Sequence, residues 1–95
     1  MPVIGVLTLE LRLDESHSLK DKRQVVKSLK DRLHQKFNVS VAEIDFQELW
    51  QRALLAAVTV SSEQHHAEEV LNAVERETVH LVGPMLVAAN LEWIS

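Results

Sequence analysis

Apolar residues occupy every second position over the first part of the chain. From Val3 to Leu13 the odd-numbered positions are all apolar or glycine, whereas the even-numbered positions become polar at Thr8, Glu10 and Arg12. Successive side chains of a β-strand point to opposite faces, so this alternation predicts a strand with one buried face.

Two longer segments instead repeat their apolar residues every three or four positions, which is typical of amphipathic helices. The first helix is predicted to begin after Ser18, whose hydroxyl can cap it, and to end near Lys36. The second is expected to be capped by Ser61 or Ser62 and to end near Val79. Their expected buried stripes are Leu19, Val26, Leu29, Leu33 and Phe37 in the first helix, and Ala67, Val70, Leu71, Val74 and Thr78 in the second.

Three shorter apolar stretches predict the remaining strands. They lie around residues 39–44, from Ala53 to Ser61, and from Met85 to Ile94 after a Gly-Pro break. The unbroken apolar run of the second stretch is typical of the centre of a sheet. The resulting β-α-β-β-α-β order predicts one α+β domain over residues 1–95. We expect a ferredoxin-like sandwich, in which two helices cover one face of a four-stranded antiparallel sheet.

The composition is that of an ordinary globular protein, because 46% of the residues are hydrophobic and 25% are charged. There are no cysteines, which excludes disulfides and thiolate chemistry and is compatible with a reducing cytosol. The longest apolar run is far shorter than the ~20 residues that span a membrane, and the first residues lack a signal-peptide pattern. We therefore expect a cytoplasmic protein with no membrane partner.

The charges are strongly segregated along the chain. Seven of the ten Lys and Arg residues lie between Lys20 and Lys36 with only Asp21 and Asp31 among them, which gives this segment a net charge of +5. The rest of the chain holds three basic and twelve acidic residues, a net charge of −9. An overall charge of −4 therefore conceals one basic helix on an acidic molecule.

One side of this helix forms what we call the basic edge, which consists of Lys20, Arg23, Lys27, Lys30 and His34. The phosphate backbone of a nucleic acid binds to cations spaced along a surface, and we expect most of these cations to lack acidic partners. The alternative is a solvated helix face whose lysine stems cover the rim of the core. Lys22 falls on the apolar side of the first turn, and its ammonium is expected to reach solvent.

Three short motifs stand out: SLKDKR at Ser18–Arg23, FNVSVAE at Phe37–Glu43 and LWQRA at Leu49–Ala53. Together with the residues between them, they make the stretch from Ser18 to Val60 resemble the YlxP-like family of small bacterial proteins of unknown function. The resemblance implies a ferredoxin-like fold. Members tend to be encoded near translation and ribosome-maturation factors, so it also implies a connection with RNA or the ribosome. It implies no catalytic residues, because the family has none assigned.

Candidate catalytic and metal-binding groups are few. Glu43, Asp45 and Glu48 could hold a hard cation such as Mg²⁺, but a solvated strand end is the preferred interpretation. A phosphoryl-transfer enzyme of this topology needs hydrogen-bond donors in the loop after the first strand, where this chain has Asp14 and Glu15. We therefore expect no enzymatic activity, no metal, no cofactor and no small-molecule substrate.

Two functions of different classes remain open. The first is an accessory protein that binds structured RNA or a ribosomal subunit through the basic edge. The second is a protein-interaction or homodimerisation module, because helices on one side of a sheet leave its other face uncovered. Trp93 is expected in the core, whereas Trp50 either caps the sheet or meets a partner. The residues expected to contact a partner are Ile4, Val6, Leu55, Leu86 and Trp50.

Overall fold

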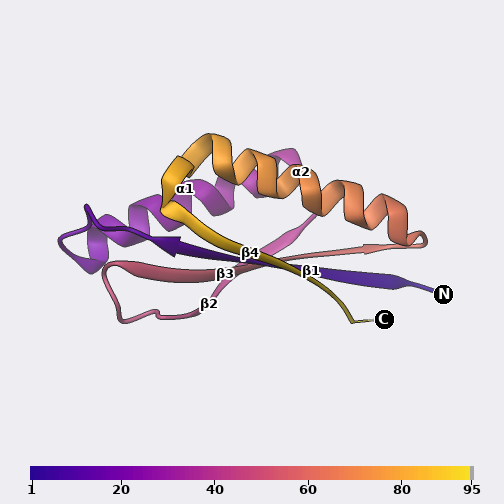
Figure 1. Ribbon diagram of the computed structural model, residues 1–95, viewed down its shortest axis with the longest axis horizontal. Helices are drawn as coiled ribbons and strands as arrows, with labels where there is room; N and C mark the ends of the chain where they lie inside the picture. Colours follow the sequence, from indigo (N-terminus) through magenta and orange to yellow (C-terminus); the bar gives the residue numbers. More distant parts are fainter. Residues whose placement is uncertain (95) are drawn as a thin grey trace.

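The computed structural model describes residues 1–94 and places four antiparallel strands in one sheet. Two helices lie over the same face of this sheet, and a short 3-10 helix follows the second of them (Figure 1). The predicted ferredoxin-like α+β fold is therefore confirmed. The strands follow the order β2-β3-β1-β4 across the sheet. The elements are β1 (Val3–Arg12), α1 (Leu19–Lys36), β2 (Ser40–Asp45), β3 (Arg52–Ser61), α2 (Gln64–Val82), η1 (Gly83–Met85) and β4 (Leu86–Trp93).

The start of α1 is fixed by local hydrogen bonds. The Ser18 hydroxyl accepts a hydrogen bond from the backbone N–H of Asp21 at 3.1 Å, and the Asp21 carboxylate accepts one from the N–H of His17 at 3.0 Å. This reciprocal pair resembles a capping box and satisfies an N–H that the first turn leaves without a helical acceptor. The predicted cap and bounds of the first helix are confirmed.

Helix α2 differs from its prediction at both ends. Glu63 precedes the helix and makes no capping hydrogen bond with its side chain, so the predicted cap at Ser61 or Ser62 is wrong. Ser61 still belongs to β3, and its hydroxyl accepts a hydrogen bond from the N–H of Glu63 at 3.1 Å. The helix continues to Val82 and stops at Gly83, whose φ of 55° lies in the region that glycine adopts at little cost.

The core lies between the sheet and the two helices. On β1 the odd-numbered leucines predicted to be buried point into it, and none is more than 3% exposed. Most residues of the expected stripes of the two helices are buried, but Leu19, Phe37 and Val70 are only half-buried. The core residues are Leu7, Leu9, Leu11, Leu13, Val26, Leu29, Leu33, Val41, Ala53, Leu55, Ala57, Leu71 and Val74.

Trp93 lies directly opposite Gly5 on the neighbouring strand. A methyl group on Gly5 would come within 2.8 Å of both the Trp93 ring and the Leu71 side chain. Glycine at this position therefore leaves the space that the indole fills. Trp93 is expected from the sequence to lie in the core; its ring lies on the helix-covered side of the sheet, but the residue is half-buried and is not one of the buried core residues.

Leu55 of β3 and Leu86 of β4 lie on the opposite face of the sheet from that predicted. On β4 the change is confined to Leu86, because its register with β1 shifts between Glu10 and Leu11, whereas Ala88 lies on the uncovered face as expected. Leu55 is fully buried beneath the helices and Leu86 packs against the core, so neither lies on the uncovered face of the sheet. Leu55 pairs with Leu9 and Leu86 pairs with Leu11, which are both on the buried face of β1. An unbroken apolar run such as that of β3 has no alternation, so its register is set by the partner strand rather than by its own sequence.

Candidate nucleic-acid interface

The basic edge runs along the solvent-facing side of α1. Lys20, Arg23, Lys27 and His34 are exposed, and Lys30 is half-buried. Successive members are three or four residues apart, a spacing that aligns side chains on one face of a helix. At the rise of an α-helix the row is about 21 Å long, which is enough to follow several phosphates of a nucleic-acid strand.

Only one cation of the basic edge has an acidic partner among residues 1–94. Lys27 bonds to Asp31 at 2.7 Å, and this hydrogen bond, aided by the attraction between the charges, raises the pKa of Lys27 and lowers that of Asp31. Both side chains are more than half exposed, so water screens the pair and leaves the lysine available to other anions. Lys20, Arg23 and Lys30 form no ion pair within the described residues.

The cations on the opposite flank of α1 connect the two helices. Arg32 bonds to Glu77 of α2 at 3.1 Å and Lys36 bonds to the same carboxylate at 2.8 Å. The Glu77 side chain is only 9% exposed, and the hydrogen bond from Lys36, followed by that from Arg32, lowers the pKa of its carboxyl group. These two cations are therefore engaged in joining the helices.

His34 connects the basic edge to the outer edge of the sheet. Its Nε2 atom accepts a hydrogen bond from the backbone N–H of Val41 in β2 at 3.2 Å. Because β2 is the last strand on its side of the sheet, this ring satisfies a donor that no further strand pairs with. A ring nitrogen that accepts a hydrogen bond carries no proton, so this atom does not donate to a phosphate in the observed arrangement.

Lys22 is buried, and the expectation that its ammonium reaches solvent is wrong. The side chain is 1% exposed, and its Nζ atom lies 2.9 Å from the Glu43 carboxylate. It also lies 2.7 Å from the carbonyl oxygen of Phe46, 3.2 Å from that of Gln47 and 3.3 Å from that of Arg52. Four oxygens thus surround one ammonium group, which compensates for its removal from water.

Four of the seven cations between Lys20 and Lys36 consequently have acidic partners, although on the basic edge itself Lys27 alone has one among residues 1–94. The partners come from β2, from α2 and from the next turn of α1. Charge counting along the helix could not reveal the first two because those elements are distant in sequence. The four paired cations are Lys22, Lys27, Arg32 and Lys36.

The loop between β2 and β3 is held in place from two sides. On one side Lys22 binds its carbonyl groups. On the other, the Gln51 side chain donates to the carbonyl oxygens of Asp14 and Ser16, each at 3.2 Å. Phe46 has a φ of 64°, which is uncommon for a bulky residue. The Arg52 guanidinium covers the Phe46 ring at 3.9 Å from its centre.

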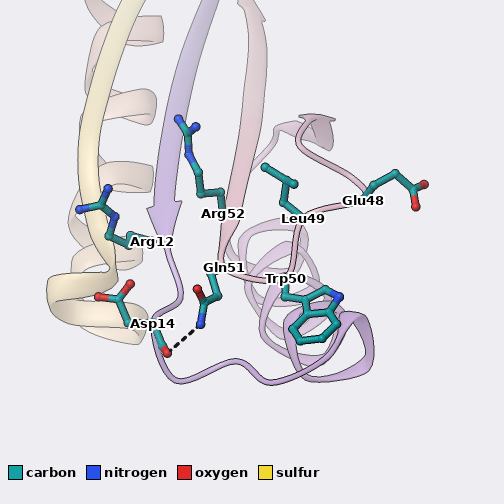
Figure 2. Close-up of a pocket in the computed structure, with 7 residues that line it drawn as sticks. All are labelled: Arg12, Asp14, Glu48, Leu49, Trp50, Gln51 and Arg52. Atoms are coloured by element: carbon teal, nitrogen blue, oxygen red, sulfur yellow. Dashed lines mark hydrogen bonds between the residues drawn. The ribbon is translucent and has the colours of Figure 1, made fainter.

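This loop borders an open hollow at the end of the sheet (Figure 2). Trp50 is 52% exposed, and its indole lies on the far side of Gln51 from Arg12. Half of the Trp50 side chain is thus open to solvent, and the rest lines the hollow beside Gln51. Charges of both signs surround the hollow, so it attracts neither anions nor cations strongly. The residues that line it are Arg12, Asp14, Glu48, Leu49, Trp50, Gln51 and Arg52.

The uncovered face of the sheet carries an apolar surface, although not through all the residues predicted. Ile4 and Val6 of β1 lie there, whereas Leu55 and Leu86 face the core. Their places are taken by the alternate residues of β3, including Val58 opposite Val6. The apolar residues of the uncovered face are Ile4, Val6, Ala42, Leu54, Ala56, Val58, Val60 and Ala88.

The acidic residues at the end of β2 are not arranged as a metal site. Glu43 binds Lys22, and the Asp45 carboxylate accepts a hydrogen bond from the N–H of Phe46 at 2.8 Å. Within residues 1–94 no group of three or more His, Cys, Asp or Glu side chains is placed to hold a metal ion. No helix in this range is long and apolar enough to cross a membrane.

Sequence comparison places the chain near proteins that have no assigned activity. A family model described as "Protein of unknown function (DUF503)" matches residues 4–83. A protein of Bacillus subtilis (strain 168) described as "Uncharacterized protein YlxP" is 39% identical over 72 residues. The aligned part covers 76% of this chain and 78% of the Bacillus protein.

Solved structures resemble this chain in fold alone. The de novo designed protein Foldit4 aligns with a TM-score of 0.61 and 11% identity, over 100% of this chain and 98% of the designed one. A putative antibiotic biosynthesis monooxygenase from Bordetella bronchiseptica aligns with a TM-score of 0.52 and 14% identity, over 100% of this chain and 97% of that chain. At such low identities a shared fold does not indicate a shared activity.

Proposed function

We propose that this chain, which belongs to the DUF503 family of proteins of unknown function, is a non-enzymatic cytoplasmic accessory protein that binds structured RNA along the basic edge of α1. The observation that carries the proposal is the row of basic side chains along α1. Lys20 and Arg23 are exposed and Lys30 is half-buried, and all three lack an acidic partner within residues 1–94. Such cations bind phosphates by releasing condensed counterions, without any need for a pocket.

The geometry favours contacts with the RNA backbone over contacts with bases. The aromatic side chains of this chain do not lie on the uncovered faces of β1 and β3, where an RNA-recognition motif stacks bases. The row on α1 consists of flexible, charged side chains that suit phosphate oxygens. We therefore expect affinity that depends on salt and RNA shape and only weakly on RNA sequence.

The choice of RNA over DNA rests on the resemblance to YlxP-like proteins, whose genes lie near those of translation factors. A ribosomal subunit is accordingly the RNA particle that we propose as partner. The absence of catalysis is part of the same proposal, and it is supported by Asp14 and Glu15 in the loop after β1, because carboxylates there disfavour a developing phosphoryl anion.

The proposal is tested by neutralising the basic edge. A variant with Lys20, Arg23, Lys27 and Lys30 all replaced by Gln should keep its circular dichroism spectrum, because these side chains are not part of the core. It should lose binding to structured RNA in a fluorescence anisotropy titration at low salt. The parent protein should sediment with ribosomal subunits from a lysate and should be released as the salt concentration rises.

A pair of matched variants separates position from total charge. Lys20→Gln with Arg23→Gln removes two exposed cations from the basic edge, and Arg12→Gln with Arg76→Gln removes two exposed cations from other elements. The first pair should weaken RNA binding and reduce the slope of its salt dependence by about one unit for each phosphate that the protein no longer binds, whereas the second should have little effect. Equal binding by the parent and the fourfold variant, or no binding by the parent, contradicts the proposed function.

A further inference from the structure

The uncovered face of the sheet presents a compact group of apolar, β-branched side chains, which we call the open-face patch and define as Ile4, Val6, Val58 and Val60. Ile4 pairs with Val60 and Val6 pairs with Val58 across the two central strands, so the four side chains adjoin one another. Val60 is 60% exposed. A contiguous apolar patch of this kind on a sheet face is typical of an interaction surface.

We propose that this face binds a second copy of the chain, sheet against sheet, to form a symmetric homodimer. The proposal does not depend on RNA binding, because it uses the opposite side of the sheet from α1 (Figure 1). In this arrangement the open-face patch of one copy covers the open-face patch of the other, and both become buried.

The size of the face agrees with this occupant. β1 and β3 each have ten residues, and a strand of that length is about 33 Å long, while four adjacent strands span about 19 Å. Because β2 has only six residues and β4 has eight, the four strands cover roughly 540 Å² per copy, or about 1,100 Å² for two copies. This area is just above the ~1,000 Å² that a specific interface should exceed.

The charges of the face also suit its own copy. Asp45 pairs with Leu54 and so lies on this face together with Glu10 and Glu92. The cations of the face are Arg12 and Arg52, so its net charge is only −1, although the chain outside the α1 segment is strongly acidic. Glu10 and Arg52 already form an ion pair at 2.8 Å. A second copy therefore meets this face with little net repulsion, whereas a polyanion gains nothing from it.

The strand order defines a simple symmetry. β3 and β1 are the two central strands of the sheet, so a two-fold axis parallel to them and midway between them places β1 of one copy over β3 of the other. Val6 then faces Val58 of the second copy, and Ile4 faces Val60 of the second copy. Sheets packed face to face in this way cross at about 30° because each is twisted.

The mass in solution tests this proposal, measured by light scattering or analytical ultracentrifugation at micromolar concentration. The parent should have twice the monomer mass of 10.8 kDa. Val6→Asp places an unpaired charge in the interface and should weaken dimerisation by about 100-fold or more. Val79→Asp is the matched control, because Val79 is 50% exposed on α2, away from the sheet face, and this variant should remain dimeric.

A charge-pairing experiment tests the proposed symmetry. Val58→Lys alone should also be monomeric, but an equimolar mixture of Val6→Asp and Val58→Lys should regain dimers, since the Asp of one copy faces the Lys of the other. Circular dichroism verifies that each variant is folded. A monomeric parent, a Val6→Asp variant as dimeric as the parent, or a mixture that stays monomeric overturns the proposal. A monomeric parent that instead binds a foreign protein through this face also overturns the proposal.

Discussion

Replacing Lys22 by Met should destabilise the protein severely, even though Lys22 lies on a helix surrounded by other lysines. Met keeps most of the volume and the flexible stem but removes the ammonium group. Glu43, whose side chain is 17% exposed, is then left without its only ion-pair partner within residues 1–94. The carbonyl oxygens of Phe46 and Gln47 lose a donor at the same time.

The magnitude follows from which of these groups water can reach afterwards. Removing one partner of a buried ion pair typically costs about 3–5 kcal/mol. The loop carbonyls can be hydrated again, because Gln47 is exposed, and Glu43 remains partly accessible to water. We therefore expect a loss near the lower limit, about 3 kcal/mol, from a free energy of unfolding that for a domain of this kind is about 5–15 kcal/mol.

The measurement is equilibrium unfolding in urea, followed by circular dichroism and by the fluorescence of the exposed Trp50 in the β2–β3 loop. The double variant Lys22→Met with Glu43→Leu removes the stranded carboxylate and should recover about 2 kcal/mol relative to Lys22→Met alone. Lys27→Met is the matched control, because Lys27 also has an acidic partner but is 77% exposed. Its free energy of unfolding should hardly change.

The reasoning is refuted if Lys22→Met loses less than about 1 kcal/mol, the value of an ordinary hydrogen bond. It is refuted as well if the double variant is less stable than Lys22→Met alone, because that result would mean that the isolated Glu43 carboxylate is not the source of the loss.

Two further variants examine contacts that connect distant parts of the chain. The pKa of Glu77 is lowered mainly by its hydrogen bond from Lys36. The ionised Glu77 carboxylate therefore stabilises the fold fully at any pH above the carboxyl pKa of the unfolded chain, about 4.3. This stabilisation disappears as the pH falls through the lower pKa of the folded state. Glu77→Gln should therefore be less stable than the parent at neutral pH, with the difference in urea midpoint shrinking in acid; a difference that grows in acid contradicts this. Gly5→Ala should lower the free energy of unfolding by about 1–3 kcal/mol through overpacking, because the new methyl group would come within 2.8 Å of Leu71 and Trp93. Thermal unfolding measures the loss of stability. An unchanged midpoint would mean that those side chains move aside freely.

The part of the candidate site that depends only on helical periodicity could be predicted from the sequence. The spacing of Lys20, Arg23 and Lys27 places them on one side of a helix whose other side is buried, and they are exposed as expected. The partners of α1 were not predictable. Glu77 and Glu43 come from elements far along the chain, and only the packing of α1 against α2 and β2 brings their carboxylates to Lys36 and Lys22.

The sequence by itself determined the order of the elements and the bounds of α1. A strict alternation identifies β1, and Ser18 with Asp21 provides a local start signal, so both depend on residues that are neighbours in the chain. The tertiary structure alone decided which face of β3 is buried. Every position from Ala53 to Val58 is apolar, so either face satisfies the core equally, and hydrogen-bonded pairing with β1 selects one. Tertiary structure also decided that the Lys22 ammonium is buried instead of solvated. A long cationic side chain can bind the oxygens that the fold places within its reach. Those oxygens come together only when the β2–β3 loop packs over the first turn of α1.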